Sequence, residues 1–420
     1  MDPFVIINGE QWDILYCCVC LTSLDKVKPP ALSIEMKENF ELGERLESVY
    51  PLLDIIFEYL NDKDLDNVMN VKKSWGSIAE RLLKKRSQPC WVTCYQDRGN
   101  VFFKDSGNLH FNNASAAIVL FGRHYNLNEY ISLHEDTNTF QQMKFVEYFN
   151  KEIISRNISF CILTCPKVVS YFSQDVENRY GSIFDTLFLP VIPGIRTTMF
   201  YCNFSKLKKN PGLLEKHIKP SEEVKCLLLF DEYDIRSSVD HLFKIILKET
   251  KPEELALGGG LIHGIDAFNK QKEIPEITRN KNETFCIAFT KERGTEPNFN
   301  AASFVIRGSE LTEEELNEEL LKFKKNIIMR SNSIALRVCC QAKKGKKKES
   351  LIFNAHFPNT SLLGLEAAGE IGWNCFNLPH AEVPEPVESK PKKSKKHYPK
   401  FQHEWSTVFV VITWGDIVEM

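Results

Sequence analysis

The feature that most constrains this chain is a short run of helical patterning near its front, from Leu46 to Arg86. A proline at position 51 can occupy the first turn of a helix without losing a hydrogen bond, because the first N–H groups of a helix have no intrahelical partner. Apolar side chains then follow at helical spacing and form one wide stripe. The stripe consists of Leu52, Ile55, Ile56, Tyr59 and Leu60.

Two further helices are predicted within the same run. Asp62 is a suitable N-cap for a short helix that carries Leu65 and Val68. The next helix has Trp75 on its apolar side and ends in the cations of residues 84–86, which a helix C-terminus favours. Helices in a segment this short bury too little apolar surface to be stable alone. We therefore expect the apolar stripe to pack against another surface, either of a partner protein or of this chain.

In register and residue type, the run resembles the F-box. The resemblance rests on Pro51, Ile55, Ile56, Phe57, Tyr59, Leu60, Asp64, Leu65, Val71 and Trp75. The sequence departs from that motif at Lys72, where cysteine is usual, and at Val49 and Tyr50, where leucine usually precedes the proline. The resemblance implies that the run binds a Skp-type SCF adaptor. The implied anchors are Pro51, Leu52, Ile55, Ile56, Tyr59, Leu60, Leu65, Val68 and Trp75.

Two other interpretations of the run stay open. One is an ordinary helical subdomain that packs on its own chain. The other is a helix-turn-helix that reads DNA through the third helix. The basic residues of that helix favour the second interpretation, but no Asn, Gln or Arg cluster stands at its front, where base edges would be met. Direct binding of nucleic acid is therefore not expected.

Composition limits the class of protein. The chain has 420 residues, of which 43% are hydrophobic and 26% charged, enough for two or three domains with a large core. The formal net charge of -3 predicts no global attraction to nucleic acid or membrane. No apolar run reaches the roughly 20 residues of a membrane helix, and the N-terminus lacks the pattern of a signal peptide. We expect an intracellular protein that is cytoplasmic and nuclear.

The cysteines predict thiols rather than disulfides or a metal site. Thirteen cysteines are scattered through apolar segments of a long chain, and a reducing compartment keeps such residues as thiols. Cys17, Cys18 and Cys20 lack the further Cys or His ligands that zinc needs. No metal and no cofactor are expected.

Beyond residue 88 the apolar pattern changes from helical to strand-like, which predicts a mixed α/β fold. An amphipathic helix is predicted over residues 138–156, between strands at 91–95, 114–121, 158–164, 182–191 and 195–204. The expected organisation is a flexible lead over 1–44, F-box-like helices over 45–88, and α/β modules over 89–222 and 223–420. A flexible Lys/Pro insert is expected at about 380–403, within the last module.

The second module carries glycine-based signals. Gly258, Gly259 and Gly260 follow a short apolar strand, which predicts a backbone close to another strand, a turn or a ligand. Thr312 and Glu315 have capping-box spacing and predict a helix. Further expectations are a strand pair at 284–290 and 302–307, a strand at 333–341, a strand, turn and strand over 362–373, and a terminal strand at 407–414 whose edge completes the last sheet.

In their order, these signals resemble the FIST domain. A C-terminal FIST module ends with G-x-x-x-x-G-E-I-G, which Gly364 and residues 369–372 match. An F-box followed by FIST modules implies the substrate-recognition subunit of an SCF-type (adaptor, cullin, RING) E3 ubiquitin ligase, which recruits protein substrates for ubiquitination and proteasomal degradation. Such a receptor works by proximity, so we expect no catalytic residues and no enzyme activity of its own.

The alternative is a FIST-type small-ligand sensor without ligase association. Its site would comprise Gly258, Gly259, Gly260, Cys340, Gly369, Glu370 and Gly372. Cys340 precedes the lysine cluster of residues 343–348 and is a candidate reactive thiol. That cluster and residues 390–397 are expected to be solvated loops or nuclear-import signals. Hydrolase and transferase motifs are lacking, which argues against an active site.

Overall fold

The computed structural model describes most of the chain after residue 49. The described residues are 4–7, 10–13, 50–60, 62–97, 100–106, 114–123, 130–134, 140–144, 158–172, 182–232, 239–248, 250–269, 283–308, 311–375 and 398–418. The chain divides into two compact units, Met1–Leu60 and Asn61–Met420. Among the helices of the described residues, none is long and apolar enough to cross a membrane.

The first unit contains a small hairpin and one helix. Strands β1 (Phe4–Ile7) and β2 (Glu10–Asp13) pair antiparallel within the lead expected over 1–44. Alternation over four residues is too short to separate a strand from a loop by sequence alone. Helix α3 (Tyr50–Glu58) confirms the predicted apolar helix. The lead between residues 14 and 49 lies outside the described residues.

The second unit begins with the other two predicted helices, α4 (Asp62–Met69) and α5 (Lys73–Arg86). One face of α5 buries Ile78, Ala79 and Leu82. A Cβ at Gly76 would lie 3.1 Å from the Met69 carbonyl oxygen, so glycine lets the start of α5 approach the end of α4. Both helices therefore form where the apolar spacing predicts them.

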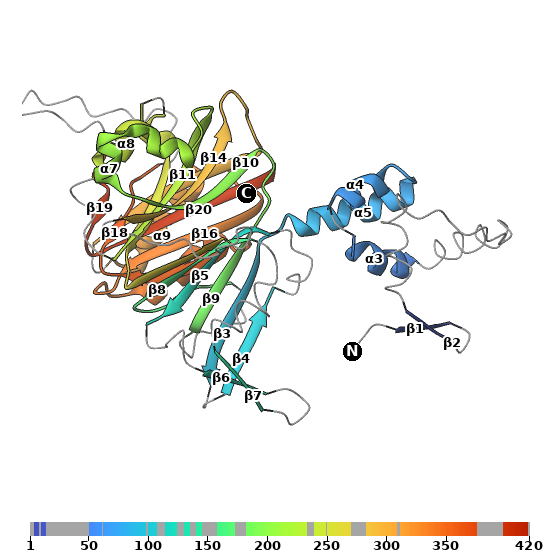
Figure 1. Ribbon diagram of the computed structural model, residues 1–420. Coiled ribbons are helices and arrows are strands. Elements are labelled where there is room, and N and C mark those ends of the chain that lie inside the picture. The colour runs from blue at the N-terminus through green and yellow to red at the C-terminus, as the bar shows by residue number, and fades with distance from the viewer. Residues whose placement is uncertain are drawn as a thin grey trace, which may run out of the picture. The chain divides into compact units, whose positions relative to one another are not determined.

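Three larger mixed sheets follow in the same unit (Figure 1). The first sheet has the order β13-β8-β5-β9-β3-β4. Its strands are β3 (Cys90–Asp97), β4 (Asn100–Asp105), β5 (Ala114–Gly122), β8 (Ser159–Cys165), β9 (Ser182–Pro190) and β13 (Gly264–Asn269). Strands β5 and β8 are parallel and the other pairs are antiparallel.

The second sheet has the order β10-β14-β11-β12-β18-β19. Its strands are β10 (Ile195–Cys202), β11 (Glu222–Asp231), β12 (Ala256–Leu261), β14 (Thr284–Glu292), β18 (Glu370–Ile371) and β19 (Gln402–His403). Helices α7 (Phe204–Lys209) and α8 (Asp240–Ile246) accompany it, with the short 3-10 turns Pro211–Lys216 and Pro252–Glu254. Helix α8 lies in the connection between the parallel strands β11 and β12.

The third sheet has the order β15-β20-β16-β17. Its strands are β15 (Phe299–Arg307), β16 (Arg330–Cys340), β17 (Ser361–Ala367) and β20 (Ser406–Ile417). Helices α9 (Glu313–Lys325) and α10 (Lys346–His356) cover it. Aromatic rings join the layers, with Phe304 on Phe323 at 5.1 Å and Phe353 on Phe409 at 4.8 Å between ring centroids.

The mixed α/β class and most predicted strands are confirmed, but the strands cross the expected boundary at residue 222. Strand β10 precedes that residue and belongs to the second sheet, whereas β13 follows it and belongs to the first. The division into two modules stays a prediction. Each expected module contributes a strand to the sheet built mainly by the other.

The helix predicted over 138–156 is wrong where the structure describes it. Residues Phe140–Lys144 form β7, which pairs antiparallel with β6 (Tyr130–His134). A short apolar pattern fits a helix face or a hairpin strand, and only the partner strand decides between them. Residues 145–157 lie outside the described residues.

Three other expectations about the second half are corrected. Strands β14 and β15 do not pair with each other, because β14 lies between β10 and β11 while β15 pairs with β20. The terminal strand β20 is an interior strand, with β15 and β16 on its two sides. The lysine-rich segment from Lys346 begins helix α10 instead of a loop. Strand order is set by contacts between distant segments, which local patterning does not encode.

Candidate functional site

Helix α3 carries apolar side chains on opposite sides. Leu53 and Phe57 are buried, whereas Ile55 is 49% and Tyr59 67% exposed. Ile55 and Tyr59 are four residues apart, so they are neighbours on one face of the helix. Among the other predicted anchors, Leu52, Ile56 and Leu60 are half-buried, and Pro51 lies in the first turn. The exposed face is thus apolar where a surface helix is ordinarily polar.

In the second unit, the predicted anchors differ in accessibility. Leu65 is fully buried and packs as core, whereas Val68 and Trp75 are half-buried. Met69 and Val71 are exposed, and neither was predicted as an anchor. The i, i+4 spacing from Leu65 could have identified Met69.

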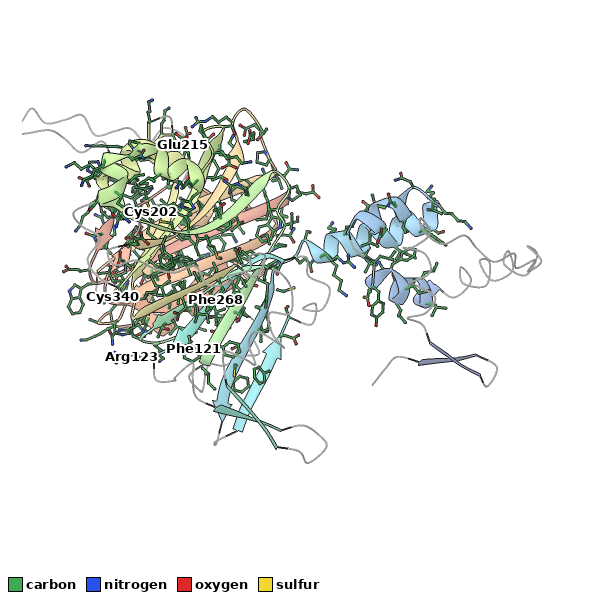
Figure 2. All side chains as sticks on the ribbon, viewed as in Figure 1. Phe121, Arg123, Cys202, Glu215, Phe268 and Cys340 are labelled. Atoms are coloured by element: carbon green, nitrogen blue, oxygen red, sulfur yellow. The ribbon has the colours of Figure 1, made fainter. Side chains whose placement is uncertain are left out.

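The residues predicted for a ligand site converge where the second and third sheets meet. Gly260 pairs with Glu370 between β12 and β18, and Leu261 N donates to Gly369 O at 2.9 Å. Cys340 ends β16 of the third sheet (Figure 2), and its thiol hydrogen bonds the Glu370 carboxylate. The structure therefore brings Gly260, Cys340, Gly369 and Glu370 together.

The glycines at this junction are packed against neighbouring strands. A Cβ at Gly258 would lie 2.3 Å from Val410 Cγ2. Gly259 has a φ of +133°, and its Cβ would lie 1.8 Å from Leu229 O. A Cβ at Gly372 would lie 2.5 Å from Val408 Cγ1. These glycines lie in or beside strands and permit close approach of backbone and sheet, which is the first of the three alternatives that the sequence left open for Gly258, Gly259 and Gly260.

Glu370 is the buried carboxyl of the junction. It is 1% exposed, and its Oε2 accepts hydrogen bonds from Ser406 N at 3.2 Å and Ser406 Oγ at 2.7 Å. Burial raises the pKa of Glu370, and hydrogen bonds from Ser406 and Cys340 oppose that rise. Across the β18–β19 pair, His403 Nε2 donates to Gly372 O at 2.9 Å. Burial lowers the pKa of His403, so burial favours the neutral imidazole.

A buried ionic cluster lies beside Cys340. Glu349 Oε2 accepts from Arg337 Nη2 at 2.8 Å, and Glu349 Oε1 pairs with Lys343 Nζ at 2.6 Å. Thr407 Oγ1 also donates to Glu349 at 2.7 Å. Burial acts to raise the pKa of Glu349, but the charges of Arg337 and Lys343 outweigh it and lower that pKa. Sequence reasoning missed the cluster because its members come from different elements.

The cluster corrects two expectations. Lys343 is buried and ion-paired instead of part of a solvated loop, and the import signals stay a prediction. Cys340 is also buried, whereas reactive thiols are partly exposed. The other described cysteines are likewise buried and form no disulfide, and burial raises the pKa of Cys202 (Figure 2) to about 12. Within the described residues, no group of three His, Cys, Asp or Glu side chains has metal-site geometry; Cys17, Cys18 and Cys20 lie outside them.

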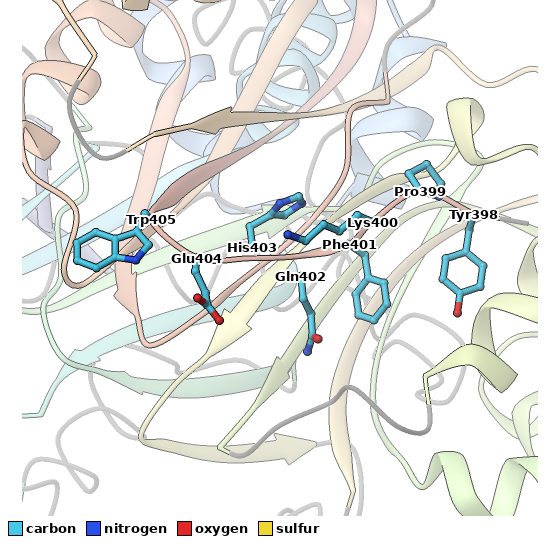
Figure 3. A pocket seen from close by; sticks show the side chains of 8 residues that line it. All are labelled: Tyr398, Pro399, Lys400, Phe401, Gln402, His403, Glu404 and Trp405. Carbon is cyan, nitrogen blue, oxygen red and sulfur yellow. The ribbon is translucent and has the colours of Figure 1, made fainter. Parts of the chain in front are cut away.

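A groove of about 780 Å³ runs along the segment before β20 (Figure 3). The described lining residues are Tyr398, Pro399, Lys400, Phe401, Gln402, His403, Glu404 and Trp405. Tyr398 and Phe401 pack on Phe243, with ring centroids 5.0 and 5.3 Å apart. Trp405 is half exposed and has a φ of +58°, a rare conformation for a bulky residue. Residues 398–403 therefore pack, although the sequence placed them in a flexible insert, and 376–397 lie outside the described residues.

A second buried carboxyl, Asp185 in β9, ties the first sheet to the third. It accepts hydrogen bonds from Thr93 Oγ1 and from Ser170. Ser170 belongs to a segment that bridges β17 through Val168–Leu365 and Tyr171–Leu362 contacts. Burial raises the pKa of Asp185 to about 6, against these hydrogen bonds.

No family model matches the chain, and no curated protein matches it. The chain is similar to the solved cyanuric acid hydrolase from A. caulinodans, at 5% identity and a TM-score of 0.31, over 72% of this chain and 90% of that one. A second cyanuric acid hydrolase structure gives 6% identity and a TM-score of 0.30, over 72% and 91%.

This finding corrects the expectation that the chain is not an enzyme, because both similar structures are named as hydrolases. The absence of an active site is therefore not maintained. At these TM-scores the likeness transfers no chemistry, substrate or catalytic residue to this chain.

Proposed function

We propose that this chain is a substrate-recognition subunit of an SCF-type E3 ubiquitin ligase. Its front helices bind a Skp-type adaptor, and through it a cullin and a RING subunit, while the sheets hold protein substrates for ubiquitination and proteasomal degradation. We place this work in the cytoplasm and nucleus. The observation that carries the proposal is the exposed apolar face of α3, Ile55 and Tyr59, within a run that resembles the F-box.

The exposed face has the chemistry of a protein interface. An aliphatic and an aromatic side chain stand exposed one helical turn apart, and aromatic residues are enriched at interface cores. Burying such side chains contributes about 1.5–3 kcal/mol each. Met69 and Val71 in the second unit add exposed apolar side chains of the same kind. Each unit thus offers exposed apolar side chains that a partner can cover.

In this role the chain acts by bringing its substrate close to the charged E2. Holding a target near the charged E2 raises the effective concentration of its lysines near the thioester. The rigid sheets suit the holding role, because binding sites on rigid elements are more precisely placed than those on loops.

A pull-down of recombinant adaptor by the full chain tests the proposal. Ile55→Asp combined with Tyr59→Asp is expected to abolish capture, because charges replace the apolar contact. Ile56→Asp with Leu60→Asp extends the test to the half-buried anchors. The matched control is Leu351→Asp, an exposed leucine on α10 of the sheet-bearing unit. Equal capture by the wild type and both double variants would refute the adaptor assignment.

The small-ligand sensor is the second candidate, and the junction around Glu370 is the observation that favours it. The predicted residues meet there around a buried carboxyl, but neighbouring atoms fill the space beside the glycines. Native mass spectrometry of the purified chain separates the candidates. A retained small molecule without adaptor binding supports the sensor, whereas adaptor and cullin recovery supports the ligase.

A further inference from the structure

A buried tryptophan of the third sheet holds the end of helix α5. Trp414 in β20 is 1% exposed, and its Nε1 donates to the Ser87 carbonyl oxygen at 2.9 Å. Ser87 is the C-cap of α5, and its own N–H donates to Leu83 O. The last carbonyls of a helix have no intrahelical partner. The indole therefore satisfies one of them from a distant part of the chain.

The tryptophan itself is firmly placed. In β20 it stands opposite Phe299 on one side and Asn332 on the other. The next residue, Gly415, donates to Asn298 O at 3.0 Å and accepts from Arg330 Nη1 at 2.8 Å. A residue fixed on both sides of an interior strand gives the helix a rigid attachment.

Helix α5 has a second attachment, through the chain itself, to the first sheet. Only Ser87, Gln88 and Pro89 separate α5 from β3, and proline restricts the backbone of the residue before it. Trp91 is the second residue of β3. Its ring stacks on Phe172 with ring centroids 4.9 Å apart, and its backbone N–H donates to Ser106 Oγ at 3.2 Å. The end of α5 is thus held covalently at the first sheet and by Trp414 at the third.

We infer that Trp414 is a positioning residue that fixes the direction of α5 relative to the sheets. A short link alone leaves a helix free to swing, and a second point of attachment removes that freedom. The consequence for ubiquitin transfer rests on the proposed function: if α5 belongs to the adaptor-binding run, its direction sets the distance from a held substrate to the charged E2. Transfer by proximity depends steeply on that distance.

Trp373 provides a matched control. It is also 1% exposed, and its Nε1 donates to the Leu255 carbonyl oxygen at 2.7 Å. Replacing either tryptophan by phenylalanine removes a buried indole donor and the same side-chain volume. Both changes are expected to lower the melting temperature by a few degrees, about 2–8 °C. They differ in that only Trp414 is bonded to α5.

The first experiment measures the distance between α5 and the sheets in the full chain. Spin labels are placed on exposed Ser77 of α5 and exposed Glu215 (Figure 2) through a keto amino acid, because the chain has 13 cysteines. Pulsed electron paramagnetic resonance measures the distance between the two labels. We expect a narrow distribution of that distance for the wild type and Trp373→Phe, and a broad one for Trp414→Phe. If the Trp414→Phe distribution stays as narrow as that of the control, the inference is overturned.

A second variant isolates the hydrogen bond from packing. Benzothienylalanine at position 414 keeps the bicyclic shape and replaces the ring N–H by sulfur, so folding is retained even if the phenylalanine variant unfolds. Broadening with this residue supports the inference, and wild-type width contradicts it.

The functional experiment reconstitutes the chain with adaptor, cullin, RING subunit and charged E2, and follows its self-ubiquitination. Trp414→Phe is expected to bind adaptor as the wild type does but to lose about threefold or more in initial rate, with Trp373→Phe unchanged. Equal rates for the two variants would overturn the role in transfer. Failure of the wild type to bind adaptor would instead refute the proposed function, and the distance measurement would still decide whether Trp414 holds α5.

Discussion

The helical run and the junction of the second and third sheets are built on opposite principles. On α3, Ile55 is 49% and Tyr59 67% exposed. At the junction the strands pack so closely that a methyl group in place of a hydrogen on Gly258 or Gly259 would overlap neighbouring atoms. The comparison teaches that local patterning reveals surface left for a partner, whereas packing between distant strands stays hidden in the sequence.

The largest effect is expected at the junction, from Gly259→Ala. The φ of +133° disfavours alanine, and the new Cβ would meet Leu229 O at 1.8 Å. We expect a loss of about 4 kcal/mol or more in the free energy of unfolding, measured by urea denaturation. Gly294→Ala is the control, because its φ of +77° carries strain but no atom lies within 4 Å of the new Cβ. Equal losses would mean that close packing does not explain the glycine.

The buried ionic cluster should respond almost as strongly. Glu349→Gln leaves Arg337 and Lys343 buried without their shared anion, which is expected to cost about 3–5 kcal/mol. The matched change Glu313→Gln affects an exposed pair, 4.0 Å from Lys348, and should cost less than about 1 kcal/mol. Thermal unfolding of both variants measures the difference, and a small effect at Glu349 would place that cluster in solvent.

Asp185 gives an intermediate and pH-dependent effect. Its folded-state pKa of about 6 exceeds the ordinary value of 3.8, so the stability linked to its protonated form is present below pH 3.8 and is lost as pH rises to about 6. Asp185→Asn lacks this loss. The stability of the variant relative to the wild type should therefore rise by about 2 kcal/mol between pH 4 and pH 7. Urea denaturation at both pH values measures it, and a flat difference would contradict the raised pKa.

The smallest effect on stability is expected on the helical run, at Tyr59→Ser. An exposed side chain contributes little to folding, so the melting temperature should change by less than about 1 °C, while adaptor capture weakens if α3 is the docking helix. Phe57→Ser, which changes a side chain on the buried face of the same helix, is the contrasting variant. It should unfold α3, which circular dichroism would detect as a loss of helicity. A destabilising Tyr59→Ser would show that this face packs on the chain itself.

The parts of the fold that could be predicted are those encoded locally. Thr312 and Glu315 form the expected capping box, with Glu315 N to Thr312 Oγ1 at 3.2 Å and Thr312 N to Glu315 Oε2 at 2.9 Å. Helix α3 and strand β5 follow from apolar spacing in the same way. The interior position of β20 could not be predicted, because its neighbours β15 and β16 are chosen by tertiary packing.

In the candidate site, too, the features encoded locally could be predicted, and those set by contacts between distant segments could not. Glycines with a nearby Glu370 correctly suggested close backbone approach, but the partners that fill the space, such as Val410, come from another sheet. A run of lysines reads as solvated, and Glu349 with Arg337 turns one of them, Lys343, into a buried group. The adaptor anchors stay a prediction, since their test is a partner and not a fold.

The exchange of strands between the first two sheets has a consequence for synthesis on the ribosome. Strand β8 is nearly all apolar, and its outer neighbour β13 starts about a hundred residues later in the chain, at Gly264. Until that segment leaves the ribosomal exit tunnel, β8 is an unpaired apolar edge strand that can pair with another nascent polypeptide. Chaperone capture of the half-made product should therefore end only once β13 has emerged.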